Sequence, residues 1–193
     1  MGRVWAMPVE QEHRMESGEA ALVAAAQADP AAFDALYRRY LGRVYRYLRA
    51  HVGSDDEAAD LTQQVFLKAL DALPRYRPQG TPFAAWLFQI ARHAAADAHR
   101  RRRPTVTWDA LPEALHPLEE QEPEADLLRR EALARLGALL ARLDARKREL
   151  LALRFAAGLT APEIARVVGK RPDAVKKQLS RTIQMLKEQY HAG

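Results

Sequence analysis

The segment 159–181 limits the possible folds most, because residue types mark its helix boundaries. Thr160 followed by Glu163 is a capping box, which starts a helix at a defined position. Gly169 readily takes the positive φ that ends a helix, and Pro172 suits the first turn of the next one. The segment therefore predicts two helices joined by a tight turn, a helix-turn-helix.

The second helix of this pair has an apolar face and a cationic face. Its buried stripe is predicted from apolar residues at helical spacing, Val175, Leu179, Ile183 and Leu186. A second helix with outward cations commonly enters the major groove of DNA, with residues near its start on bases and later cations on phosphates. We expect the DNA contacts from Arg171, Asp173, Lys176, Lys177, Ser180 and Arg181.

Composition excludes several classes of protein. The chain has 193 residues, a formal charge of +5 and no cysteine, so we expect neither a disulfide framework nor a thiolate zinc site. No apolar run approaches the roughly 20 residues of a membrane span, and the start of the chain lacks the apolar core of a signal peptide. We expect a cytoplasmic protein with no membrane insertion, metal or other cofactor, and the charge weakly favours a polyanionic partner.

Residue usage also predicts an all-α fold, because β-branched residues are few while Ala, Leu, Arg and Glu dominate. Two small helical domains are expected over 18–103 and 126–193, after a disordered lead-in over 1–17. An acidic flexible linker, 104–125, is expected between them. The stretch 104–126 supports the linker, since it holds seven acidic residues and four prolines but no Lys or Arg.

Apolar residues at helical spacing predict the individual helices. Asp29-Pro30, Gly53-Ser54 and Pro74 mark breaks between them. Ahead of the helix-turn-helix we expect helices over 19–28, 31–51, 55–73, 82–102, 127–143 and 146–155.

Three segments in register, 60–69, 83–92 and 149–186, resemble bacterial RNA polymerase sigma factors of the sigma-70 family, in the extracytoplasmic-function (ECF) subgroup. The resemblance implies that the N-terminal domain, as sigma region 2, binds core polymerase and reads the −10 promoter element. It implies that the C-terminal domain, as sigma region 4, reads the −35 element. The linker would thread through the polymerase's basic cleft, although a plain spacer is an equally good interpretation.

The implied partners are core RNA polymerase, through the clamp and flap of its large subunits, and promoter DNA. Members of the subgroup are commonly held by an anti-sigma factor, but no residue of this chain indicates one. For core binding the resemblance points to Asp60, Leu61, Gln63, Gln64 and Leu67. An ordinary amphipathic helix is the alternative interpretation of this segment. Gln64 stands where relatives often have Glu, so one contact would lose its charge.

Residues expected at the −10 element come from a loop and from the helix after it. Tyr76, Arg77 and Gln79 belong to a Pro/Gly loop that could stack and read an extruded base. The helix adds His93, Asp97, Arg100 and Arg101 for base and phosphate contacts. His93 replaces the usual Asn, which we expect to alter the −10 preference. Phe83 and Trp86 are interpreted as core residues rather than as a strand-separating wedge.

Other interpretations remain. The main alternative is a stand-alone helix-turn-helix regulator that never joins polymerase, and the segment 60–69 argues against it. His93, Asp97 and His99 could be assembled into a metal site, but no further ligand cluster supports an enzyme. Lys170 and Arg171 replace an apolar turn residue and a Ser N-cap of the family. Loss of that cap costs about 1 kcal/mol, and the added charge favours DNA.

Overall fold

The computed structural model describes the backbone of residues 9–101 and 123–192, and side chains of 18–100 and 131–192. Within these ranges the chain is helical and carries no strand, which confirms the predicted all-α class. Most of the predicted linker and the first half of the predicted lead-in lie outside the described residues. None of the described helices is long and apolar enough to cross a membrane.

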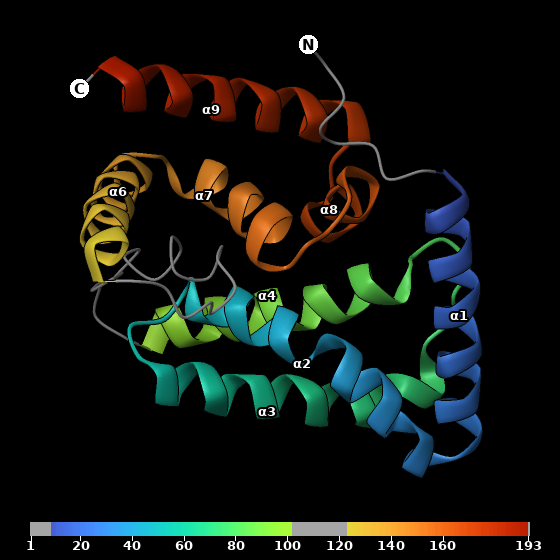
Figure 1. The fold of residues 1–193 in the computed structure, drawn as a ribbon. Coiled ribbons are helices and arrows are strands. Elements are labelled where there is room, and N and C mark those ends of the chain that lie inside the picture. Colours follow the sequence, from blue (N-terminus) through green and yellow to red (C-terminus); the bar gives the residue numbers. More distant parts are fainter. Residues whose placement is uncertain (1–8, 102–122, 193) are drawn as a thin grey trace.

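The N-terminal domain consists of three helices that lie side by side and a fourth that crosses their ends (Figure 1). In Figure 1, α1 stands across the ends of α2, α3 and α4, which lie side by side. The elements are α1 (Val9–Ala28), the 3-10 turn η1 (Pro30–Ala32), α2 (Phe33–Arg49), α3 (Asp55–Ala72), the 3-10 turn η2 (Leu73–Arg75) and α4 (Phe83–Arg101).

Helix α2 is the centre of this domain. One of its faces is buried along its whole length, with Phe33, Leu36, Tyr40, Val44, Tyr47 and Leu48 at three- and four-residue spacings. The ring of Tyr40 lies 5.5 Å from Phe83, and that of Tyr47 lies 5.5 Å from Phe88. Aromatic contacts between α2 and α4 therefore fix the helix that carries part of the predicted DNA surface.

Helix starts agree with local residue chemistry, with two differences from expectation. Ser54 was expected only to mark the end of the preceding helix. Its side chain accepts a hydrogen bond from the Glu57 backbone N–H at 3.3 Å, so it is also the N-cap of α3. Helix α1 begins at Val9 rather than Glu19, and so extends into the segment that we expected to be a disordered lead-in.

The C-terminal domain contains α6 (Pro123–Ala141), α7 (Ala145–Leu151), the π-helical segment η3 (Ala152–Ala156), α8 (Ala161–Val168) and α9 (Pro172–Ala192). Helix α6 begins three residues before the predicted domain boundary. The predicted helix-turn-helix is confirmed. Thr160 and Glu163 form both bonds of the capping box, and Gly169 ends α8 with a φ of 66°.

The two domains pack against each other. Helix α8 contacts α4, and η3 contacts α2. Buried apolar residues of both domains form one continuous cluster. Figure 1 shows α9 on the side of the C-terminal domain away from the N-terminal domain. The sequence predicted both domains but not the contact between them.

Candidate functional site

Helix α3 presents a polar edge with one apolar side chain in it. Asp60, Gln63, Gln64 and Leu67 lie within two turns and are all exposed, because the opposite face of α3 is buried against the domain core. Leu67 is 63% exposed, and it is the large hydrophobic side chain on the surface of the described residues. Burying a leucine contributes about 2 kcal/mol, so this edge is well suited to a protein partner.

The structure does not support the prediction that Leu61 contacts core polymerase directly. Its side chain is only 3% exposed and belongs to the core. Leu61 follows the exposed Asp60 directly, and one residue corresponds to about 100° of rotation around a helix. Its side chain therefore points to the inner side of α3. Leu61 therefore positions the exposed edge of α3 and offers no surface to a partner in this conformation.

Tyr76 also differs from expectation, because its ring lies inside the domain rather than on the loop surface. It packs 4.9 Å from Trp86 and 5.7 Å from Phe83, and its hydroxyl donates to the Thr81 carbonyl at 2.8 Å. Burial, with the charge of Glu19, raises the pKa of Tyr76 to about 12. The ring offers no face for a base in this conformation, whereas its partner Trp86 fits the predicted core role.

The loop around Tyr76 is held by side chain to backbone bonds. Gln27 of α1 donates to the carbonyls of Leu73 and Tyr76, at 2.9 and 2.8 Å. Arg77 donates to the Tyr76 carbonyl at 3.0 Å and is exposed, as is Gln79. Arg75 of the same loop is exposed as well.

The outer face of α4 carries the other −10 candidates. His93 and Arg100 are exposed, and Asp97 forms an ion pair with Arg100 one turn later. His93, Arg100, Arg146 and Lys170 line one cavity of about 640 Å³ between the domains. Arg101 ends α4, and its side chain lies outside the described residues.

Helix α9 and Arg171 before it expose every residue predicted to contact the −35 element. Arg171, Asp173, Lys176, Lys177, Ser180 and Arg181 are all exposed, because Val175, Leu179 and Thr182 occupy the buried face. Lys177, Arg181 and Lys147 of α7 line one surface hollow. Lys170, in the turn before α9, donates to the Gln178 side chain at 3.0 Å and thereby stabilises the turn of the helix-turn-helix.

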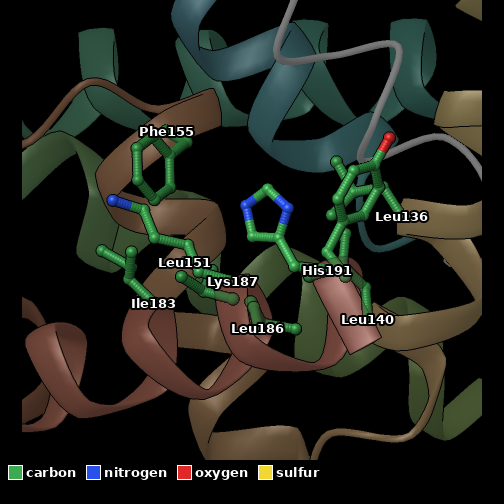
Figure 2. A pocket seen from close by; sticks show the side chains of 9 residues that line it. Leu136, Leu140, Leu151, Phe155, Ile183, Leu186, Lys187 and His191 are labelled. Carbon is green, nitrogen blue, oxygen red and sulfur yellow. The ribbon is translucent and has the colours of Figure 1, made fainter. Parts of the chain in front are cut away.

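An apolar groove in the C-terminal domain was not predicted from the sequence. It has a volume of about 320 Å³ and lies between α6, the α7–η3 segment and α9, with Leu136, Leu140, Leu151, Phe155, Ile183 and Leu186 as its apolar lining. Figure 2 shows the His191 ring between Phe155 and Leu136. Ile183 and Leu186, expected in a buried stripe, are only partly buried, because the other helices do not cover the end of α9.

Glu149 of α7 connects the two domains, and no local sequence pattern predicts this role. Its Oε1 accepts from the Tyr47 hydroxyl at 3.0 Å and lies 3.5 Å from Arg92 Nε. Its Oε2 lies 2.8 Å from His51 Nε2. Burial raises the pKa of Glu149, but the bonds and charges of His51, Tyr47 and Arg92 outweigh it, so the pKa lies below its ordinary value.

His51 completes this arrangement through its second ring nitrogen. Nδ1 lies 2.7 Å from the Tyr47 carbonyl, which can only accept a hydrogen bond. Since the Glu149 carboxylate also accepts, the ring serves both partners only when both nitrogens carry protons. Each ring nitrogen of His51 therefore faces a hydrogen-bond acceptor, one from each domain.

Backbone carbonyls of the C-terminal domain receive a second set of contacts. Arg43 of α2 donates from Nε to the Ala157 carbonyl at 2.7 Å and from Nη2 to the Gly158 carbonyl at 3.2 Å. Gln89 of α4 donates to the Arg166 carbonyl at 3.0 Å. These bonds hold the turn before α8 and the last turn of α8, and so set where the helix-turn-helix lies relative to α4.

Comparison with known families and proteins gives a consistent result. The sequence matches Sigma-70 region 2 over residues 36–105 and Sigma-70, region 4 over residues 133–186. The ECF RNA polymerase sigma factor SigD of Mycobacterium tuberculosis is 39% identical over 156 residues, which cover 78% of this chain and 73% of SigD. The ECF sigma factor BldN of Streptomyces coelicolor is 39% identical over 168 residues, covering 86% of this chain and 63% of BldN.

Solved structures agree with this match. CnrH, in complex with the cytosolic domain of CnrY, has a TM-score of 0.66 and 27% identity, covering 90% of this chain and 97% of that chain. The sigma factor RpoE from Bartonella quintana, in complex with the anti-sigma factor NepR, shares the fold. Its TM-score is 0.59 at 22% identity, covering 81% of this chain and 94% of that chain.

Proposed function

Since the chain belongs to the sigma-70 family, in the ECF subgroup of sigma factors that direct RNA polymerase to promoters, we propose how its domains share this task. The N-terminal domain binds core polymerase and reads the −10 element. The C-terminal domain reads the −35 element. The protein acts in the cytoplasm with polymerase and has no enzymatic activity of its own.

The observation that carries this proposal is the exposed edge of α3. An apolar side chain that is 63% exposed, surrounded by Asp60, Gln63 and Gln64, resembles the centre of a protein interface with its polar rim. The clamp of polymerase would cover Leu67 and pair with Asp60.

The proposed DNA contacts follow the exposed side chains. On the −10 side, Arg77 and Gln79 contact the separated strand, His93 and Asp97 contact bases, and Arg100 with Arg101 contacts phosphates. On the −35 side, Arg171 and Asp173 lie at the start of α9 and contact bases. The later residues Lys176, Lys177, Ser180 and Arg181 contact the phosphate backbone.

The apolar groove of the C-terminal domain suits a partner helix. Its apolar wall accepts the one apolar face of an amphipathic helix, as in other helix-in-groove complexes. We assign this groove to the flap of core polymerase. An anti-sigma factor is a competing partner, since CnrH and RpoE were solved with the cytosolic domain of CnrY and with NepR.

In-vitro transcription with core polymerase on a library of randomised promoters tests the proposal. We expect selection of sequences at two separated elements, and Leu67→Asp should raise the core concentration for half-maximal transcription at least about tenfold, since it places a charge in the proposed interface. Ala35→Asp, which adds the same charge at an exposed position of α2, is the control. Initiation without sequence selection, or tight promoter binding by the free protein alone, would contradict the proposal.

A further inference from the structure

The Gln27 side chain of α1 is bound to the start of the loop that we propose to read the −10 element. Its Nε2 donates to the Leu73 carbonyl at 2.9 Å and to the Tyr76 carbonyl at 2.8 Å. A side-chain amide has two N–H donors, so these two bonds use both of them. The accepting residues are 46 and 49 positions further along the chain, and the amide therefore joins two segments that are distant in sequence.

The two carbonyls lie where the chain leaves the helical part of the domain. Leu73 begins the 3-10 turn η2, and Tyr76 ends it with extended backbone, at φ −63° and ψ 136°. Residues 77–80, which follow directly, are all exposed. The Tyr76 carbonyl is thus the last backbone group that α1 holds, and its position sets where Arg77 and Gln79 project from.

The far end of the same loop is held by the Tyr76 hydroxyl. It donates to the Thr81 carbonyl at 2.8 Å, and the Tyr76 ring is itself only 5% exposed. Between these two fixed carbonyls, Gly80 takes a φ of 91°, a conformation that suits a tight return of the chain. The exposed part of the loop is therefore short and fixed at both ends, so that binding costs less ordering free energy.

Helix α1 is in turn fixed to the domain core, which gives the Gln27 amide a defined origin. Val23 and Ala26 are 5% and 4% exposed and belong to the buried cluster. The Glu19 carboxylate accepts a hydrogen bond from the Tyr40 hydroxyl of α2. The placement of α1 is therefore passed to the loop through Gln27.

We propose that Gln27 is a positioning residue for −10 recognition, which sets base selectivity by fixing the loop that carries Arg77 and Gln79. The proposal rests on the proposed function, because it requires this loop to read the −10 element. Hydrogen bonds weaken steeply with poor geometry, and discrimination between bases depends on such bonds. A loop released from Gln27 still meets the strand but distinguishes its bases less well.

In-vitro transcription with core polymerase tests this role on two promoter libraries, one randomised only at −10 and one only at −35. Gln27→Met keeps the length and helix propensity of the side chain but has no N–H donor. The ratio of preferred to other bases should fall about tenfold at one or more −10 positions, while the −35 ratios stay unchanged. A loss of stability alone lowers the amount of active protein and leaves these ratios as they are.

Further variants make the test specific. Gln27→Glu has the shape of the original side chain and also lacks donors, so it should act as Gln27→Met does. Tyr76→Phe keeps the ring and removes only the bond to Thr81, and should shift the same −10 ratios by a smaller factor. Ala25→Gln adds an amide at an exposed position of α1 and should change no ratio. Backbone amides of 77–81 should exchange faster in Gln27→Met than in the unmodified free protein.

Gln79→Ala, which removes a side chain proposed to contact the strand, separates the two proposals. If Gln79→Ala lowers the −10 ratios and neither Gln27 variant does, the positioning role is overturned while the proposed function stands. Faster amide exchange with unchanged ratios would make Gln27 a structural residue only. An equal fall of the −10 and −35 ratios would also overturn the positioning role. No selection at −10 by the unmodified protein would contradict both proposals.

Discussion

The two domains solve the problem of a small helical core in different ways. The N-terminal domain closes around α2 with aromatic rings whose hydroxyls reach polar partners, as Tyr45 does at Asp55, 2.9 Å away. The C-terminal domain uses aliphatic residues such as Leu153 and Ile164, and it leaves a groove of about 320 Å³ open. The first domain leaves only the single side chain of Leu67 as a large exposed hydrophobic among the described residues, whereas the second leaves a whole apolar groove.

This contrast predicts that damage to the core is largest in the N-terminal domain. Leu36 is fully buried in the first turn of α2, so Leu36→Ala should lower the free energy of unfolding by about 3 kcal/mol. Chemical denaturation followed by helicity measures this change. Leu67→Ala, at an exposed position of α3, should change it by less than about 0.5 kcal/mol. Equal effects of the two variants would contradict the described core.

Next in size we expect the loss of domain pairing in acid. Glu149 has a lowered pKa where the two domains pack together, and it is faced by Tyr47 of α2, by His51 just after α2 and by Arg92 of α4. Its contribution is present above the ordinary carboxyl pKa and is lost as the pH falls through the lowered one.

The distance between spin labels on Asp71→Cys of α3 and Gln189→Cys of α9, both exposed positions, should therefore increase below about pH 4, near the ordinary carboxyl range. Helicity of the N-terminal domain, which does not depend on Glu149, should be retained at the same pH. Glu149→Gln should remove this acid step, and a step that survives in the variant would assign it to another group.

A smaller effect is expected from the cap of α8. Thr160→Ala removes the side chain that accepts from the Glu163 backbone, and should destabilise the C-terminal domain by about 1 kcal/mol. Glu163→Gln should cost less, because an amide oxygen can still accept from the Thr160 backbone. Hydrogen exchange of the α8 amides distinguishes this local loss from global unfolding, and an effect spread equally over α2 would argue against it.

The smallest effect on the fold should come from the DNA-facing side of α9. Lys176→Ala should change the free energy of unfolding by less than about 0.5 kcal/mol. In the assembled holoenzyme it should weaken binding to all promoters and reduce the salt-dependence slope by about 1. Lys176→Arg keeps the charge and should keep the slope, so a reduced slope in this variant would refute a phosphate contact.

Sequence reasoning succeeded where the determining residues are close together in the chain. The capping box and Gly169 act within one helical turn, and the buried stripe of α2 depends only on helical spacing. It failed for Tyr76, because an aromatic residue in a Pro/Gly loop can turn inward or outward. The choice depends on whether Trp86 and Phe83 leave room for the ring.

Contacts between distant segments were beyond such reasoning. Glu149 is 102 residues from Tyr47 and 98 from His51, and no local pattern associates them. The groove was missed for a related reason, since Ile183 and Leu186 have the spacing of buried residues. Whether other helices extend far enough to cover them is decided by helix lengths and crossing positions.

The number of residues in the π-helical segment Ala152–Ala156 helps to determine how the two domains contact each other. Its wide turn is closed by a bond from the Ala157 N–H to the Ala152 carbonyl at 3.0 Å. A wide turn accommodates one residue more than an α-helix, and one residue corresponds to about 100° of rotation. Deleting a single alanine here would turn the Ala157 and Gly158 carbonyls away from Arg43, although Glu149, Tyr47 and His51 would all still be present. Insertions and deletions in this segment would thus alter coupling between the domains in a way that no survey of substitutions would detect.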